Sequence, residues 1–206
     1  MKKKILMALA LIGCAVVLVA GTIAGTVAYL TSTSGTLKNT FTVGNVSITM
    51  DEAKVNVYGE QIGTDRVSGR ADDVVANTYK LIPGHNYTKD PTITVTGGSE
   101  SCYLFVKVEN GISAIEAGTT IADQMEDNGW TALAGQTGVY YMEYDSDPND
   151  KKIPVFAEFT IADNAVVSNY LNATINVTAY AVQADGFDTA ADAWGATFGA
   201  SANQYS

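Results

Sequence analysis

The sequence predicts an all-β protein, an antiparallel β-sandwich of jelly-roll type with one or two short helices. Apolar residues alternate with polar residues over several segments, which is the pattern of strands with one buried and one solvated face. β-branched and aromatic residues fill these segments, and helical periodicity is confined to two short stretches. With 206 residues, 47% of them hydrophobic and 17% charged, the chain has the composition of one folded domain.

The predicted strands are separated by turn residues along the chain. They span 41–49, 54–58, 75–82, 92–96, 102–108, 139–144, 155–161 and 172–181. Pro83-Gly84 predicts a type II turn, because proline fixes φ at the second position and glycine accepts a positive φ at the third. The glycine-rich and aspartate-rich stretches at 97–99 and 145–150 are predicted hairpin loops. Short helices are predicted over 120–127 and 189–197.

Residues 1–28 have the layout of an export signal: a basic start, an apolar run over 5–20 and small residues over 21–28. Small side chains suit the peptidase, so cleavage is predicted between Ala28 and Tyr29. Two alternatives stay open. No charged residue occurs over 5–30, so the segment is long enough to act as an uncleaved anchor. Cys14 also ends a lipobox-like Leu-Ile-Gly-Cys, although the sequence after it continues apolar.

The charge balance and the scarcity of histidine exclude several classes of function. Without residues 1–28 and their three lysines, the chain has 9 basic and 22 acidic residues, a net charge of −13 that disfavours nucleic-acid binding. His85 is the one histidine, so a zinc site needing two imidazoles is excluded. It is predicted to be a solvated turn residue. No nucleophile or phosphate-loop motif occurs, so we expect a non-enzymatic protein without a cofactor.

Cys102 is the one cysteine that remains after signal removal, so no internal disulfide can form. Its place on the face shared by Leu104, Val106 and Val108 predicts burial, with a reactive thiol as the alternative. Asp145, Asp147 and Asn149 form a weak calcium candidate, because oxygen ligands alternate there. Asp150 stands where an EF-hand loop needs glycine, so a polar hairpin loop is the preferred interpretation.

Several stretches, in this order along the chain, resemble the TasA/camelysin family of secreted Gram-positive proteins. They are Gly25-Thr-Val-Ala-Tyr-Leu-Thr-Ser32, Asn39-Thr-Phe-Thr-Val-Gly44, Leu81-Ile-Pro-Gly84, Lys89-Asp-Pro-Thr-Ile93, Tyr103-Leu-Phe-Val-Lys-Val108, Ala179-Tyr-Ala-Val-Gln-Ala-Asp-Gly-Phe187 and Ala193-Trp194. No single stretch is specific, but the ordered set covers most of the chain.

The resemblance implies a secreted jelly-roll subunit of extracellular biofilm matrix fibres, located in the matrix or on the cell surface of a Gram-positive bacterium. It implies processing by a SipW-type signal peptidase, a homopolymer that a minor matrix subunit can join, and membrane contact only through the signal segment. The domain layout is then 1–28 signal peptide, 29–40 extended donor segment and 41–206 β-sandwich. The expected assembly residues are Tyr29, Leu30, Leu37, Phe41 and Val43.

The residues themselves are compatible with strand donation. Segment 29–40 is rich in Thr and Ser, and Lys38 is its one charge, so it can complete an open sheet edge on a neighbour. A floppy mature N-terminus is the alternative. Two other functions stay open: a monomeric surface module that binds carbohydrate or a host ligand through exposed tyrosines and Trp130, and a camelysin-like secreted metallopeptidase. The zinc-ligand spacing that the peptidase needs is missing.

Overall fold

The structure is a computed structural model that describes residues 45–62 and 76–199, together with the backbone of residues 31–34. Its strands are β1 Thr31–Ser34, β2 Ile48–Asp51, β3 Asn86–Thr88, β4 Thr92–Val95, β5 Cys102–Asn110, β6 Glu116–Ala117, β7 Thr131–Ala132, β8 Val139–Tyr144, β9 Lys151–Pro154, β10 Glu158–Ile161 and β11 Ile175–Gln183. Its helices are α2 Ile121–Asp127 and α3 Ala190–Phe198, with 3-10 turns η1 Ser113–Ile115 and η2 Val167–Tyr170.

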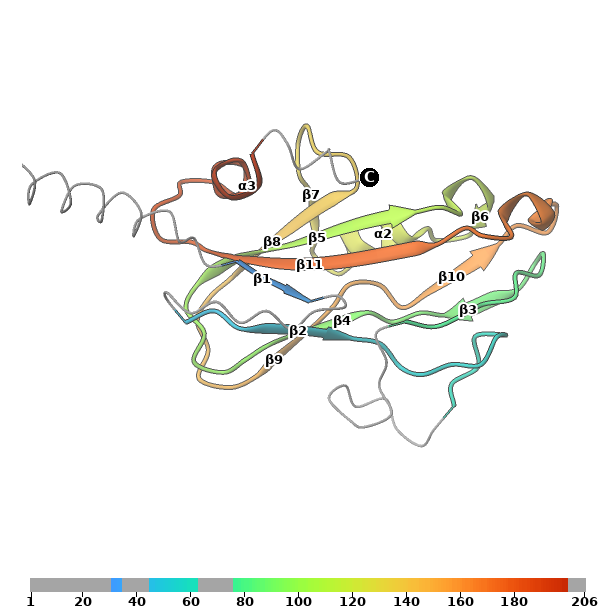
Figure 1. The fold of residues 1–206 in the computed structure, drawn as a ribbon, viewed down its shortest axis with the longest axis horizontal. Coiled ribbons are helices and arrows are strands. Elements are labelled where there is room, and N and C mark those ends of the chain that lie inside the picture. Colours follow the sequence, from blue (N-terminus) through green and yellow to red (C-terminus); the bar gives the residue numbers. More distant parts are fainter. Residues whose placement is uncertain (1–30, 35–44, 63–75, 200–206) are drawn as a thin grey trace, which may run out of the picture.

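The strands form three antiparallel sheets in two layers (Figure 1). A five-stranded sheet, in the order β1-β11-β5-β8-β7, faces two three-stranded sheets with the orders β2-β4-β9 and β3-β10-β6. The prediction of an all-β sandwich with two short helices is confirmed. The jelly-roll connectivity stays a prediction.

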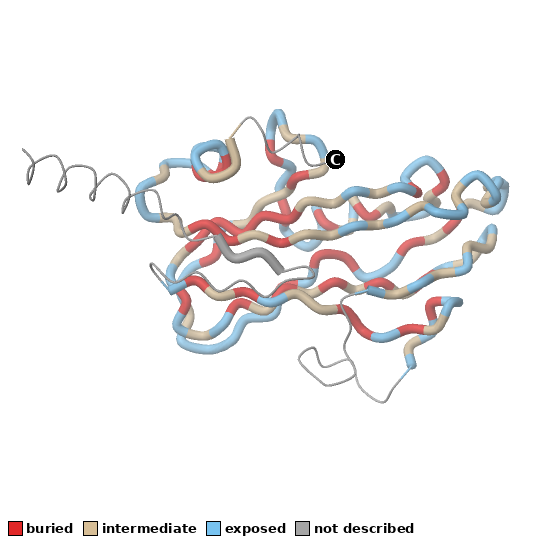
Figure 2. The backbone as a smooth tube through the Cα atoms, viewed as in Figure 1, coloured by how far each residue is buried: buried red, intermediate tan, exposed pale blue. Residues whose placement is uncertain are grey.

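The main core lies between the layers, and the alternation of β5 and β11 builds it. Leu104 and Val106 of β5 and Ala179 of β11 face inward and are fully buried with Ile93 and Phe159 of the opposite layer (Figure 2). The residues between them in sequence face outward and form a second, smaller cluster under α3. Both faces of this sheet are therefore covered along much of its length, which explains why its two longest strands are so rich in apolar and aromatic residues.

Both predicted helices are present, and each begins at a threonine. The Thr120 side chain accepts a hydrogen bond from the Asp123 backbone N–H, while the Asp123 carboxylate accepts one from the Thr120 N–H, a capping box. Thr189 caps α3 in the same way by accepting from the Asp192 N–H. Trp194, a residue of α3, is buried against the sheet and so holds this helix on its outer face.

Two predicted strands are wrong. Over 54–58 the chain turns instead, because the Asn56 side-chain oxygen accepts from the backbone N–H groups of Tyr58 and Glu60, and one isolated bridge joins Val55 to Gln61. The described part of the segment predicted over 75–82 is extended but belongs to no ladder. Conversely, β3 and β9 are strands that the sequence pattern did not predict.

The turn at Pro83-Gly84 is confirmed: Gly84 has a φ of 74°, and the His85 N–H donates to the Ile82 carbonyl at 3.2 Å. The loops at 97–99 and 145–150 are not hairpins, however, since each joins strands of different sheets. They lie side by side, with the Gly97 N–H donating to Asp150 Oδ1 at 2.7 Å. Polar loop composition marks a turn but does not say whether the next strand stays in the same sheet.

Candidate functional site

The site lies along the open side of the sandwich, between β11 of the five-stranded sheet and β2 of the facing sheet. We call this side the seam. β1 is placed in it, since it pairs with β11 in the register Thr31 opposite Val182 to Ser34 opposite Ala179 and also lies against β2 (Figure 1). β1 therefore closes the half of the seam nearest the C-terminal end of β11.

The other half of the seam is open. β11 pairs with β5 over all nine of its residues, but β1 covers only four of them. In the part of the chain that the structure describes, residues 175–178 of β11 have no strand on the side away from β5. Among the described residues no strand uses the main-chain groups at this edge, and an unpaired edge of this kind can accept another extended segment.

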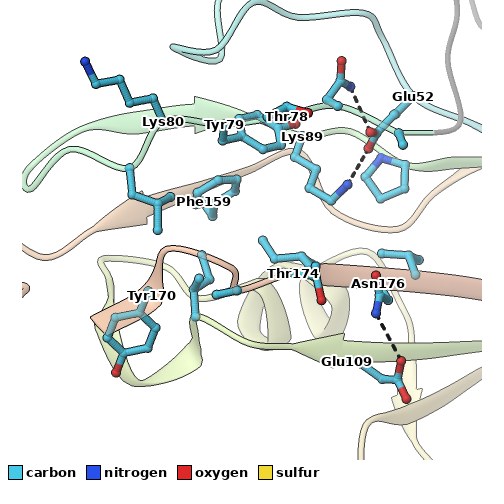
Figure 3. A pocket seen from close by; sticks show the side chains of 18 of the residues that line it. Glu52, Thr78, Tyr79, Lys80, Lys89, Glu109, Phe159, Tyr170, Thr174 and Asn176 are labelled. Atoms are coloured by element: carbon cyan, nitrogen blue, oxygen red, sulfur yellow. Dashed lines mark hydrogen bonds and ion pairs between the residues drawn. The ribbon is translucent and has the colours of Figure 1, made fainter. Parts of the chain in front are cut away.

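A groove of about 930 Å³ continues the seam beyond the end of β1. We call it the seam groove. One wall is formed by residues 173–178 with η2, and the other by residues 76–81 with the end of β2 (Figure 3). Its lining mixes apolar side chains, such as Met50, Ile175 and Val177, with polar ones, and Leu171 at its mouth is 82% exposed.

The wall over residues 76–82 has no backbone ladder and is held mainly by side chains, together with one main-chain bond from the Lys80 N–H to the Val57 carbonyl at 2.7 Å. The Asn77 carboxamide oxygen accepts from the Val55 N–H at 3.0 Å. The Tyr87 hydroxyl donates to the Lys80 carbonyl at 2.6 Å and accepts from the Ile82 N–H at 2.7 Å. The Tyr79 hydroxyl donates to the Thr88 carbonyl at 3.0 Å.

Behind this wall is a cluster of aromatic rings. Tyr87 stacks on Phe159 with ring centroids 4.9 Å apart, and Tyr79 meets both rings edge-on. Burial raises the pKa of Tyr87, although the hydrogen bond from the Ile82 N–H opposes that shift. The pKa of Tyr79 is raised even more strongly, first by burial and then by the charges of Glu52 and Asp90. Both hydroxyls therefore stay protonated and able to donate at neutral pH.

A buried ion pair lies at the wall formed by residues 76–81 and the end of β2. Lys89 Nζ is 2.7 Å from Glu52 Oε2, and the two residues are 8% and 5% exposed. The other oxygen of the same carboxylate, Oε1, accepts from Asn77 Nδ2 at 2.9 Å (Figure 3). The Asn77 amide also donates to the Ala53 carbonyl at 2.9 Å. Three segments distant in sequence thus meet at one carboxylate.

The predicted assembly and cleavage residues Ala28, Tyr29, Leu30, Leu37, Phe41 and Val43 lie outside the described residues. The predicted donor segment 29–40 is represented by the backbone of β1, which in the single chain pairs with its own β11. Sequence reasoning missed the seam groove, since Glu52, Asn77 and Lys89 have no common motif and the pattern over 75–82 indicated an ordinary strand.

The calcium candidate is not assembled as a metal site. Asp147 accepts from the backbone and side-chain amides of Asn149 at 2.8 and 3.2 Å, bonds that lower the pKa of its carboxyl, and Asp145 is exposed. Across residues 45–62 and 76–199, no three His, Cys, Asp or Glu side chains are grouped as metal ligands. The loop uses its oxygens to fix its own turn.

Trp130, predicted to be an exposed ligand contact, is 2% exposed, and its indole N–H donates to the Pro154 carbonyl at 2.9 Å. That prediction is wrong. His85 is half-buried rather than solvated: its Nε2 is 2.8 Å from the Tyr58 carbonyl and its ring lies edge-on to Tyr87. Cys102 is buried as predicted, and burial raises the pKa of its thiol to about 12.

No protein-family model, curated protein sequence or solved structure matches this chain. Within the described ranges no helix is long and apolar enough to cross a membrane.

Proposed function

We propose that this protein is a secreted, non-enzymatic subunit of extracellular biofilm matrix fibres, in which the N-terminal segment of one copy adds a strand to the next. The observation that carries the proposal is the short ladder of β1 on the long edge of β11. Four residue pairs at a sheet edge are few, and the acceptor edge continues for another four residues beside the seam groove.

Strand directions make the exchange simple. β1 runs toward the seam groove, where Ser34 lies opposite Ala179. β2 runs the same way, because its final residues line the groove, while Asn45 ahead of it bonds to Gly98 and Glu100 at the opposite end of the seam. Residues 35–44 connect these two ends within one chain.

The same ten residues, if extended, span up to about 33 Å and reach from the groove of one subunit to the start of β2 in the next. β1 then keeps its direction and register on a β11 edge that belongs to a neighbour. Such a head-to-tail contact generates a filament when its rotation does not close into a ring. The exchange is a domain swap in which an identical strand replaces the chain's own.

Electron microscopy of residues 29–206 beside residues 41–206 tests the function. We expect fibres from the first protein and none from the second. Monodisperse particles from both would contradict the proposal.

A disulfide exchange experiment separates intramolecular from intermolecular pairing. Ser32 and Ala181 are Cα partners in the β1–β11 register, at a spacing that antiparallel pairs and disulfides share. We expect Ser32→Cys and Ala181→Cys proteins, each also carrying Cys102→Ala, to form a mixed disulfide dimer after mixing. Ser32→Cys mixed with Asn176→Cys is the mismatched control. If a disulfide forms only when both cysteines are in one chain, strand donation is wrong.

A monomeric binding module is the second candidate, because the volume of the seam groove is in the range of ligand sites. It predicts a monomer whose melting temperature rises with an added carbohydrate or other ligand. No residue of the described ranges favours the metallopeptidase alternative.

A further inference from the structure

We propose that Lys89 and Asn77 become joined by an intramolecular amide bond, formed in the folded protein with loss of ammonia and with Glu52 as the proton carrier. The bond is independent of fibre assembly, so either proposal can fail without the other. It rests on three side chains that meet at the wall formed by residues 76–81 and the end of β2, although their positions in the sequence are far apart (Figure 3).

Lys89 is the nucleophile. Its Nζ lies 2.7 Å from Glu52 Oε2, a distance across which a proton passes directly from the ammonium to the carboxylate. The neutral amine that results is a competent nucleophile toward a carbonyl carbon. Both residues are almost completely buried, which limits the access of water to the amine.

Asn77 is the electrophile, and its carboxamide is held as an acyl-transfer site requires. The Val55 N–H donates to Oδ1 at 3.0 Å, which polarises the carbonyl and stabilises the negative charge that develops on this oxygen. The leaving nitrogen, Nδ2, donates to Glu52 Oε1 at 2.9 Å and to the Ala53 carbonyl at 2.9 Å. The assignment of Oδ1 and Nδ2 is consistent with all three partners, which are one donor and two acceptors.

One carboxylate thus contacts the attacking amine with one oxygen and the leaving amide with the other. For the reaction, the Lys89 amine moves around the Glu52 carboxylate to Cγ of Asn77. The Nζ–Cγ bond forms and the Cγ–Nδ2 bond breaks. Two protons leave Nζ by way of Glu52 and end on the departing nitrogen, which leaves as ammonium, and Glu52 returns to its carboxylate form. The step needs no oxidant, metal or cofactor.

The bond would fix the least supported wall of the seam groove. Residues 76–82 have no ladder of their own in the described structure, and the link would tie them covalently to the residue that follows β3. Residues 29–206 contain Cys102 as their one cysteine, so no disulfide within the chain can serve this purpose.

Mass spectrometry of the full chain, recovered in folded form, tests the proposal. We expect an intact mass about 17 Da below that of the sequence, the mass of ammonia. In a tryptic digest the cut after Lys89 should be lost, and the peptide of residues 71–80 should be joined to that of residues 81–107. Full sequence mass together with separate peptides would overturn the proposal and leave the three side chains as an ion pair with a bridging amide.

Substitutions test the roles of Lys89, Asn77 and Glu52 separately. Lys89→Arg and Asn77→Ala should have the full mass expected for their own sequences, and Glu52→Gln should stay unlinked while its circular dichroism spectrum remains that of the folded protein. Lys107→Arg is the matched control, because Lys107 also pairs with a glutamate, Glu109, but outside this cluster. It should stay linked. A linked Glu52→Gln protein would refute the role of Glu52.

Discussion

The two walls of the seam groove are built on different principles. β11 is held by main-chain hydrogen bonds to β5 over nine residue pairs, whichever side chains it has. Residues 76–82 make one main-chain bond, from Lys80 to Val57, and are held chiefly by the side chains of Asn77, Tyr79 and Tyr87. A ladder distributes support over many equivalent bonds, whereas a wall fixed by three side chains depends on each of them. Single substitutions should therefore affect the two walls very differently.

The largest expected difference comes from Tyr87→Ala. This change removes a fully buried ring, its stacking on Phe159 and two hydrogen bonds to the wall, and we expect the free energy of unfolding to fall by about 3–5 kcal/mol. On the ladder wall, Thr178→Ala should change it by no more than about 1 kcal/mol. Urea unfolding followed by circular dichroism measures both. Equal losses from the two variants would show that the walls do not differ.

Gly84→Ala tests the turn that connects residues 76–82 to β3. Gly84 has a φ of 74°, and an added Cβ would meet the Asp163 carboxylate, so we expect a loss of about 2 kcal/mol. Gly98→Ala is the matched control, since Gly98 has a φ of 79° but open space around it. Its cost should be about 1 kcal/mol, from the backbone alone. A Gly84→Ala protein no less stable than Gly98→Ala would exclude the steric contribution.

Alkaline pH should weaken the same wall. Burial raises the pKa of Tyr87 above its ordinary value of 10.0, so the folded protein keeps a proton that the unfolded chain loses. This contribution to stability is complete below pH 10 and is lost as the pH rises through the folded-state pKa, by at most about 1.4 kcal/mol per pH unit for this group. Urea unfolding at several values between pH 8 and 11 measures the slope. A Tyr87→Phe protein with an unchanged slope would assign the slope to the other groups whose pKa burial raises, which are Cys102 and the other buried or half-buried tyrosines.

The difference between the walls also explains what the sequence could predict. Alternation identified β5, β8 and β11 because each pairs over much of its length and buries one face. It also predicted a strand over 75–82, where Asn77, Tyr79 and Leu81 are half-buried between more exposed neighbours, but it could not show that this segment lacks a strand partner. Alternation reports on faces, and ladder pairing depends on segments elsewhere in the chain. β9, Lys151–Pro154, was missed for the converse reason: three of its four residues are exposed, so it has no apolar pattern.

The seam groove could not be predicted either, because its residues come together only in the folded chain. Glu52, Asn77 and Lys89 are ordinary polar residues in sequence, and only the stacking of three segments at the seam brings them to one carboxylate. The unpaired edge of β11 could not be predicted either. The sequence pattern indicates that Ile175 and Val177 face inward, but it does not show that β1 ends before it reaches them.

Tyr79→Phe is the smallest and most specific test of the comparison. It removes only the hydroxyl that donates to the Thr88 carbonyl at 3.0 Å and keeps the ring that meets Tyr87 and Phe159 edge-on. We expect a loss of about 1 kcal/mol in the free energy of unfolding, the usual value of one internal hydrogen bond. Tyr141→Phe, on the half-buried outer side of β8, is the matched control and should be close to neutral. If Tyr79→Phe is equally neutral, this hydroxyl does not support the wall, which then depends on Asn77, Tyr87 and the main-chain bond from Lys80 to Val57.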